Sequence, residues 1–251
     1  IDNGDQTLLP GDALDLDGDG NTTEAIPFDQ RGEGFDRVVN GTVDLGAVEV
    51  QTNEQTPPSD PFTVTNANDS GEGSLRSAIE EANSTSGENT ITFDSDLLSG
   101  KTITLTSGEL EVTDDLILEG LGANDLTIDA DSNSRVFRIN DGDSGNEAAV
   151  SISDLIITGG STTDDGGGIN NRENLTLTNS TISNNNAYDN GGGIYNHPYG
   201  TVTITNSTVS NNFTELGGSG IYNAGTATIT STTVSENDAI SSGGGIKNRE
   251  N

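Results

Sequence analysis

The chain has 251 residues, of which 29% are hydrophobic and 4% aromatic, and it contains no Cys, Met or Trp. Its 41 acidic and nine basic residues give a formal net charge of −32, which repels nucleic acid and anionic membranes and favours cations as partners. The lack of cysteine excludes disulfides and zinc–thiolate sites, no apolar run is long enough to span a membrane, and the scarcity of large apolar side chains argues against a thick globular core.

Residues 1–50 are rich in Asp and Gly and include the stretch DLDGDGNTTE at 15–24. Alternating carboxylates followed by Gly20 form the first half of a calcium loop, in which hard oxygens converge on the ion and glycine allows the sharp turn. The candidate ligands are Asp15, Asp17, Asp19, Asn21 and Glu24. The twelfth loop position is Ile26 rather than an acid, so the EF-hand pattern is incomplete, and an acidic solvated turn is the alternative to a Ca²⁺ site.

Residues 51–61, QTNEQTPPSDP, contain three prolines and no hydrophobic period, so they are predicted to be a linker between two pieces of the chain. A single amphipathic helix is expected next, at 74–83, with apolar residues on one face. Ser77 and Glu80 have the spacing of a capping box. This helix is predicted to cover the first turn of the domain that occupies residues 62–251.

Four related phrases follow: GGGINN, GGGIYN, GSGIYN and GGGIKN. Their isoleucines lie at intervals of 25, 27 and 25 residues, and alternating strands such as LTLTNSTISNN recur between them. A fixed period of this kind indicates stacked structural repeats. We therefore predict an all-β, right-handed parallel β-helix of about 25 residues per rung, with three strands in each turn and with less regular early rungs at 102–140.

Stacking of the rungs predicts which side chains meet. The apolar positions that are expected to pile into a core are Ile169, Ile194, Ile221, Ile246, Leu177, Ile204 and Ile229. The corner position that is expected to form a side-chain ladder is occupied by Asn185, Asn212 and Asn237.

Two stretches carry a resemblance. FTVTNANDSGEGSLRSAIEEAN, from Phe62, and the GGGIxN rungs resemble bacterial surface proteins whose body is a right-handed β-helix. Residues 12–50 resemble the closing segment of choice-of-anchor Q proteins. The resemblance implies a bacterial cell-surface or extracellular location and an adhesive or structural role. Because a closing segment precedes an opening one, the chain is expected to be cut from a longer tandem array, with its second β-helix unfinished at the C-terminal end.

Other polar residues are expected to be structural. The pairs Arg172–Glu173 and Arg249–Glu250 recur with the repeat, as surface ion pairs would. Tyr195 and Tyr222 should stack on each other rather than on a sugar. His197 lacks any nucleophile to pair with and is interpreted as part of a two-residue insertion. The acidic loop with Asp141, Asp143 and Glu147 is interpreted as solvated.

These observations favour a structural or adhesive protein without enzymatic activity, stabilised by calcium and assembled end to end with copies of itself by strand addition. Glycans are a further class of partner, and nucleic acid is not expected as one. Two alternatives stay open. One is a lyase or glycosidase that acts on polysaccharide, since β-helices also host such enzymes. The other is a ligand-binding module that uses flat faces of paired threonines, such as Thr176 and Thr178.

Overall fold

The computed structural model describes residues 2–4, 38–39, 42–44, 60–143 and 147–249. By its internal contacts the chain separates into two units, Ile1–Pro58 and Ser59–Asn251. The division falls inside the proline-rich stretch 51–61. The described part of the first unit is an antiparallel sheet with the order β1-β3-β2, formed by β1 (Asp2–Gly4), β2 (Val38–Val39) and β3 (Thr42–Asp44).

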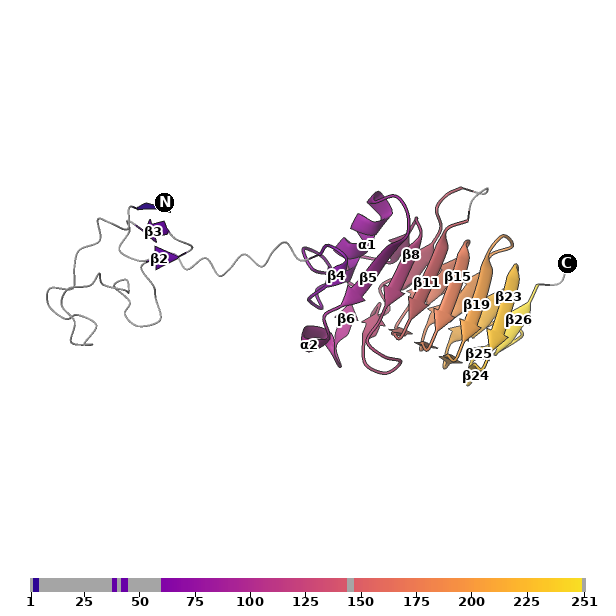
Figure 1. The fold of residues 1–251 in the computed structure, drawn as a ribbon. Helices are drawn as coiled ribbons and strands as arrows, with labels where there is room; N and C mark the ends of the chain where they lie inside the picture. The colour runs from indigo at the N-terminus through magenta and orange to yellow at the C-terminus, as the bar shows by residue number, and fades with distance from the viewer. Residues whose placement is uncertain (1, 5–37, 40–41, 45–59, 144–146, 250–251) are drawn as a thin grey trace. The chain divides into compact units, whose positions relative to one another are not determined.

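The second unit is a parallel β-helix, which confirms the predicted fold class (Figure 1). In its regular turns the chain visits four parallel sheets in succession, here named I to IV. Sheet I is formed by β7 (Leu110–Val112), β10 (Phe137–Ile139), β14 (Ile169–Asn171), β18 (Ile194–Asn196), β22 (Ile221–Asn223) and β26 (Ile246–Asn248). Sheet II is formed by β4 (Thr63–Val64), β5 (Asn89–Phe93), β8 (Leu116–Glu119), β11 (Ala149–Ser153), β15 (Asn174–Thr178), β19 (Thr201–Thr205) and β23 (Thr226–Thr230).

The other two sheets have shorter strands. Sheet III is formed by β6 (Thr102–Thr104), β9 (Thr127–Asp129), β12 (Ile156–Thr158), β16 (Thr181–Ser183), β20 (Thr208–Ser210) and β24 (Thr233–Ser235). Sheet IV is formed by β13 (Ser161–Thr162), β17 (Asn186–Ala187), β21 (Phe213–Thr214) and β25 (Asp238–Ala239). Sheet IV corrects the prediction of three strands per turn. After the asparagine corner the backbone stays extended for two residues, and these pair with the rungs on either side before the glycine run begins.

Among the residues that the structure describes, two helices lie before the regular rungs, where one was predicted. The first, α1 (Leu75–Ser84), buries Leu75, Ala78, Ile79 and Ala82 and packs against β4, β5 and β7, at the N-terminal end of the solenoid in Figure 1. The second, α2 (Ser95–Leu98), is a short turn capped by Asp94. The predicted capping box at Ser77 and Glu80 is wrong. Ser74 is the N-cap, because its backbone is extended and its hydroxyl oxygen accepts a hydrogen bond from the Ser77 amide.

Asparagine and glycine make the corners for different reasons. Asn179 and Asn184 have φ angles of 49° and 56°, a left-handed conformation that asparagine tolerates better than most residues. In the glycine run, Gly191 also has a positive φ of 66°. Gly193 is needed for space, since a Cβ atom there would lie 2.6 Å from the carbonyl oxygen of Gly220 in the next rung. The repeated glycines therefore allow both the bend and the close approach of successive rungs.

Only one corner varies in length among the regular rungs. The connections from sheet I to sheet II are residues 140–148, 172–173, 197–200 and 224–225. The connections from sheet II to sheet III stay at two residues, 179–180, 206–207 and 231–232. His197 thus lies in a connection two residues longer than the ones before and after it, and this accounts for the interval of 27 residues between Ile194 and Ile221.

Candidate functional site

The predicted core residues occupy continuous columns inside the solenoid. Ile169 pairs in register with Ile194, Ile194 with Ile221, and Ile221 with Ile246. The first three are fully buried, whereas the side chain of Ile246 is 43% exposed because no described rung covers it. A neighbouring column has the same character: Leu177 and Ile204 are fully buried, and Ile229 in the last rung is partly buried.

The predicted corner asparagines form a hydrogen-bonded ladder. The side-chain oxygen of Asn212 accepts bonds from the backbone amide of Asn185 at 3.0 Å and from its side-chain amide at 3.1 Å. Asn237 accepts the equivalent pair from Asn212 at 3.1 and 2.9 Å. The side-chain amide of Asn212 also donates to the carbonyl of Ile182. Because Asn185 and Asn212 are almost fully buried, each amide satisfies polar groups that water cannot reach.

A second ladder was missed in the sequence. The side-chain amide of Asn171 donates to the side-chain oxygen of Asn196 at 2.8 Å, that of Asn196 to Asn223 at 2.8 Å, and that of Asn223 to Asn248 at 3.2 Å. These residues end the four GGGIxN phrases, so the signal was their recurrence at the same 25, 27 and 25 intervals as the isoleucines. Two ladders fix two corners of each rung, which makes the stack resistant to slipping out of register.

The strands of the last described rung have hydrogen-bonded neighbours on one side only. Strands β23, β24, β25 and β26 are the final members of their sheets, so each leaves one edge unpaired among the described residues. In the rungs below, the corner amide N–H donates to an asparagine one rung farther on. Within the described ranges, the N–H of Asn237 has no such acceptor. Ile246, in β26, is 43% exposed, whereas the equivalent isoleucines of the rungs before it are buried.

The outer face of sheet I carries an aromatic cluster. The rings of Tyr195 and Tyr222 stack with centroids 5.2 Å apart and an interplanar angle of 10°, so they pair with each other as expected. The Lys247 ammonium lies 5.7 Å from the Tyr222 centroid, and His197 meets Tyr195 edge-on at 5.0 Å. Burial, together with the nearby Arg172 guanidinium, lowers the pKa of His197 to about 4, so this imidazole is neutral at pH 7.

Beside these rings lie several arginines that the sequence analysis did not place together. Among the described lysines and arginines, five lie in or within two residues of a strand of sheet I: Arg135, Arg138, Arg172, Lys247 and Arg249. Three of them line an open cavity of about 430 Å³ together with His197 and Asp165. Arg138 pairs with Glu111 at 2.9 Å, and the nearly buried Arg135 pairs with Glu109 and donates to two carbonyls of the glycine loop.

Asp165 lines this cavity, and the pKa of its carboxyl group is shifted. Burial raises its pKa, and the carboxylates of Asp189 and Asp164 add to the shift, although Asn190 donates two hydrogen bonds to it. With carboxylates and guanidinium groups both present, the cavity has no strong excess of one charge. In this cavity, Arg135 links the loop before β14 to the segment that leads into strand β10.

The expected surface pair of Arg172 and Glu173 is wrong. Consecutive residues of an extended chain point to opposite sides. Arg172 is exposed, whereas Glu173 is 1% exposed. The Glu173 carboxylate accepts hydrogen bonds from the backbone amides of Asp141 at 3.2 Å and Ala148 at 3.1 Å. Burial raises the pKa of this carboxyl group, and Glu173 pins the base of the long 140–148 connection.

The predicted calcium ligands, at positions 15–24, lie outside the described residues. Among the residues that the structure does describe, no group of three or more His, Cys, Asp or Glu side chains is arranged to hold a metal ion, and this includes the acidic loop around Asp141. None of the helices in this part of the chain is both long and apolar enough to cross a membrane.

Comparison of the chain with models of protein families, with curated proteins and with solved structures found no match.

Proposed function

We propose that the chain is a structural or adhesive module of a bacterial cell-surface or extracellular protein, in which β-helical rungs stack into a stiff rod. The observation that carries this proposal is the hydrogen-bond pattern that repeats from rung to rung, with the same strand register and two asparagine ladders along the stack. A strand edge in such a stack pairs with any further strand of matching pattern, whether the same chain or a second copy supplies it. The resemblance to β-helical surface proteins supports the same role.

The partner for this surface is proposed to be the 1–50 segment of another copy, which resembles a closing segment. The test is sedimentation velocity and electron microscopy of the 251-residue chain over a range of concentrations. We expect end-to-end oligomers whose fraction rises with concentration. Ile246→Glu should prevent their formation, because it places a charge on the stacking surface, where burial without a partner is costly.

Leu216→Glu is the matched control for this experiment. Leu216 is 44% exposed, nearly the same as Ile246 at 43%, but it lies in the loop between β21 and β22, which residues 241 and 242 of the following rung already cover through backbone hydrogen bonds. This variant should associate like the unaltered chain. Single particles at every concentration, or equal association of the Ile246→Glu variant, would contradict the proposed assembly.

Calcium is proposed to stabilise the first unit through the carboxylates at 15–24. Extracellular calcium modules bind with dissociation constants of roughly 0.1 to 1 mM. At the tighter limit, 1 mM Ca²⁺ should add about 1.4 kcal/mol to the free energy of unfolding of this unit. Isothermal titration calorimetry should find one site, and Asp17→Asn should weaken it at least tenfold while Asp96→Asn leaves it unchanged. Absence of binding heat, or no response of the melting temperature to a chelator, removes calcium from this account.

A further inference from the structure

The outer face of sheet IV carries an open cavity of about 410 Å³ that differs in character from the charged face of sheet I. Its lining includes Ser161, Thr163, Asn186, Tyr188, Phe213 and Glu215. None of the described lysines, arginines and histidine contributes to it. The cavity therefore combines two aromatic rings with hydroxyl and amide groups and a single carboxylate.

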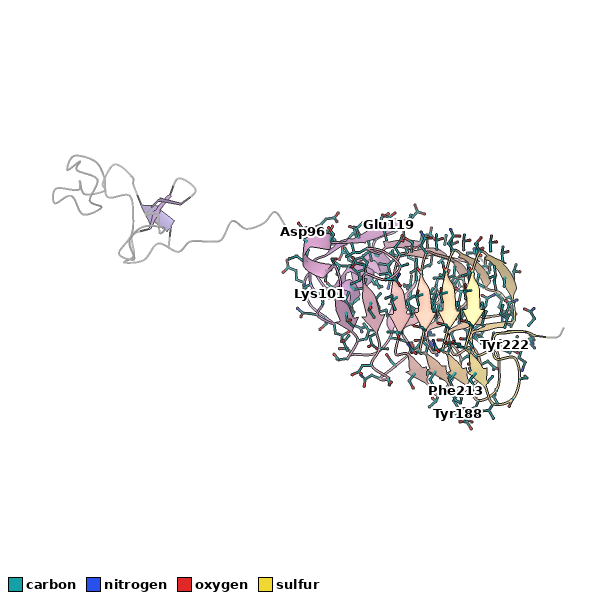
Figure 2. The ribbon with its side chains drawn as sticks, turned by 90° about the horizontal axis from the view of Figure 1, so that it is seen from below. Asp96, Lys101, Glu119, Tyr188, Phe213 and Tyr222 are labelled. Atoms are coloured by element: carbon teal, nitrogen blue, oxygen red, sulfur yellow. The ribbon has the colours of Figure 1, made fainter. Side chains whose placement is uncertain are left out.

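The strand register explains how these side chains come together. Ser161, Asn186 and Phe213 occupy one outward-facing column of successive rungs. The adjoining outward column contains Thr163, Tyr188 and Glu215, each one residue beyond its sheet IV strand. Figure 2 shows Tyr188 and Phe213 projecting from the same side of the solenoid. The two rings thus lie diagonally across neighbouring rungs, with polar groups above and below them.

The polar side chains of this face are not used by the fold. The side-chain amide of Asn185, at the buried corner, donates a hydrogen bond within the ladder. The side chain of the adjacent Asn186 is exposed and makes no hydrogen bond to any described residue. Within the same limits, the side chains of Thr163 and Glu215 also have no protein partner. Tyr188 keeps 54% of its surface in water, although its ring is apolar. These groups are available to a ligand.

We propose that this face binds an uncharged polysaccharide, with pyranose rings lying along the solenoid axis. Tyrosine and phenylalanine offer flat apolar faces for the C–H surfaces of sugar rings, while hydroxyl, amide and carboxylate groups bond the sugar hydroxyls. The rung spacing of about 4.8 Å is close to the length of one pyranose unit, so successive rungs present contacts at the period of the ligand. Glu215 and the acidic surface repel uronates and sulfated sugars.

The test uses the 251-residue chain and soluble probes: neutral gluco- and manno-oligosaccharides of four to six units, and oligogalacturonates of equal length as the charged comparison. Isothermal titration calorimetry should show binding of at least one neutral series and none of the oligogalacturonate. Tyr188→Ala and Phe213→Ala should each weaken that binding about five- to tenfold. Asn186→Ala should also weaken it without disturbing the partly buried ring of Phe213.

Tyr199→Ala is the matched control, because Tyr199 is an exposed aromatic residue, at 78%, in the 197–200 connection. It should bind the neutral sugar with unchanged affinity. Binding of oligogalacturonate alone, no binding of either series, or equal losses in the Tyr199 and Tyr188 variants would overturn the proposal. Self-association that disappears in Tyr188→Ala would instead make this face a contact between copies. These outcomes are separate from the assembly test, which concerns Ile246 and the end of the rod.

Discussion

Replacing Ile194 by alanine is expected to lower the free energy of unfolding by about 2 to 5 kcal/mol. Ile194 is fully buried and lies in register between Ile169 and Ile221, so the missing methyl and methylene groups leave a cavity bounded by rungs on both sides. The backbone hydrogen bonds of the parallel strands hold the rungs at a fixed spacing and limit how far they can close around the gap. Equilibrium urea unfolding followed by far-ultraviolet circular dichroism measures the loss.

The same column provides the control. Ile246→Ala removes the same atoms from a side chain that is 43% exposed and covered from one side only. Its effect should stay below about 1 kcal/mol, because much less apolar surface is returned to water. If both variants lose equal stability, the column is not the main support of the rungs.

Replacing Asn212 by alanine is expected to cost about 3 kcal/mol. The change removes the acceptor of the buried Asn185 amide N–H and both donors of the Asn212 side chain. A buried polar group left without a partner costs about 1 to 3 kcal/mol, and the loss of several buried bonds at one site places the expected effect at the upper end of this range. Thermal and urea unfolding give the size of the effect, and hydrogen exchange should show the largest loss of protection in β16 and β20.

Asn186→Ala is the comparison for this variant, since Asn186 is the same residue type one position beyond the ladder corner but is exposed and bonds to no described residue through its side chain. We expect a change within about 0.5 kcal/mol, as for ordinary surface substitutions. A loss for Asn212→Ala as small as this would show that the ladder does little to hold the rungs together.

The sequence predicted those parts of the fold that depend on contacts between residues at the same position of successive repeats. Spacings of 25, 27 and 25 residues align the four isoleucines, and the strands of sheet I have this alignment. The ladder that begins at Asn185 follows from the same rule. The ladder that begins at Asn171 follows the same rule, but its asparagines lie two residues after each isoleucine, inside the glycine phrase, so their recurrence is not separate from that of the phrase.

Contacts between non-equivalent positions could not be predicted in this way. Arg135 meets the loop before β14 only because the register places residues about 30 positions apart side by side. Glu173 turns inward to backbone amides of a connection whose path the repeat does not specify. The grouping of Tyr188 with Phe213 likewise depends on sheet IV, whose two-residue strands are too short to give a periodic signal.

The connection between sheets I and II changes length from rung to rung, while the strands before and after it keep their pairing. Extra residues at this one edge emerge as loops instead of shifting the rungs above them. The fold thereby accommodates added residues along this edge without altering the strand register of the solenoid.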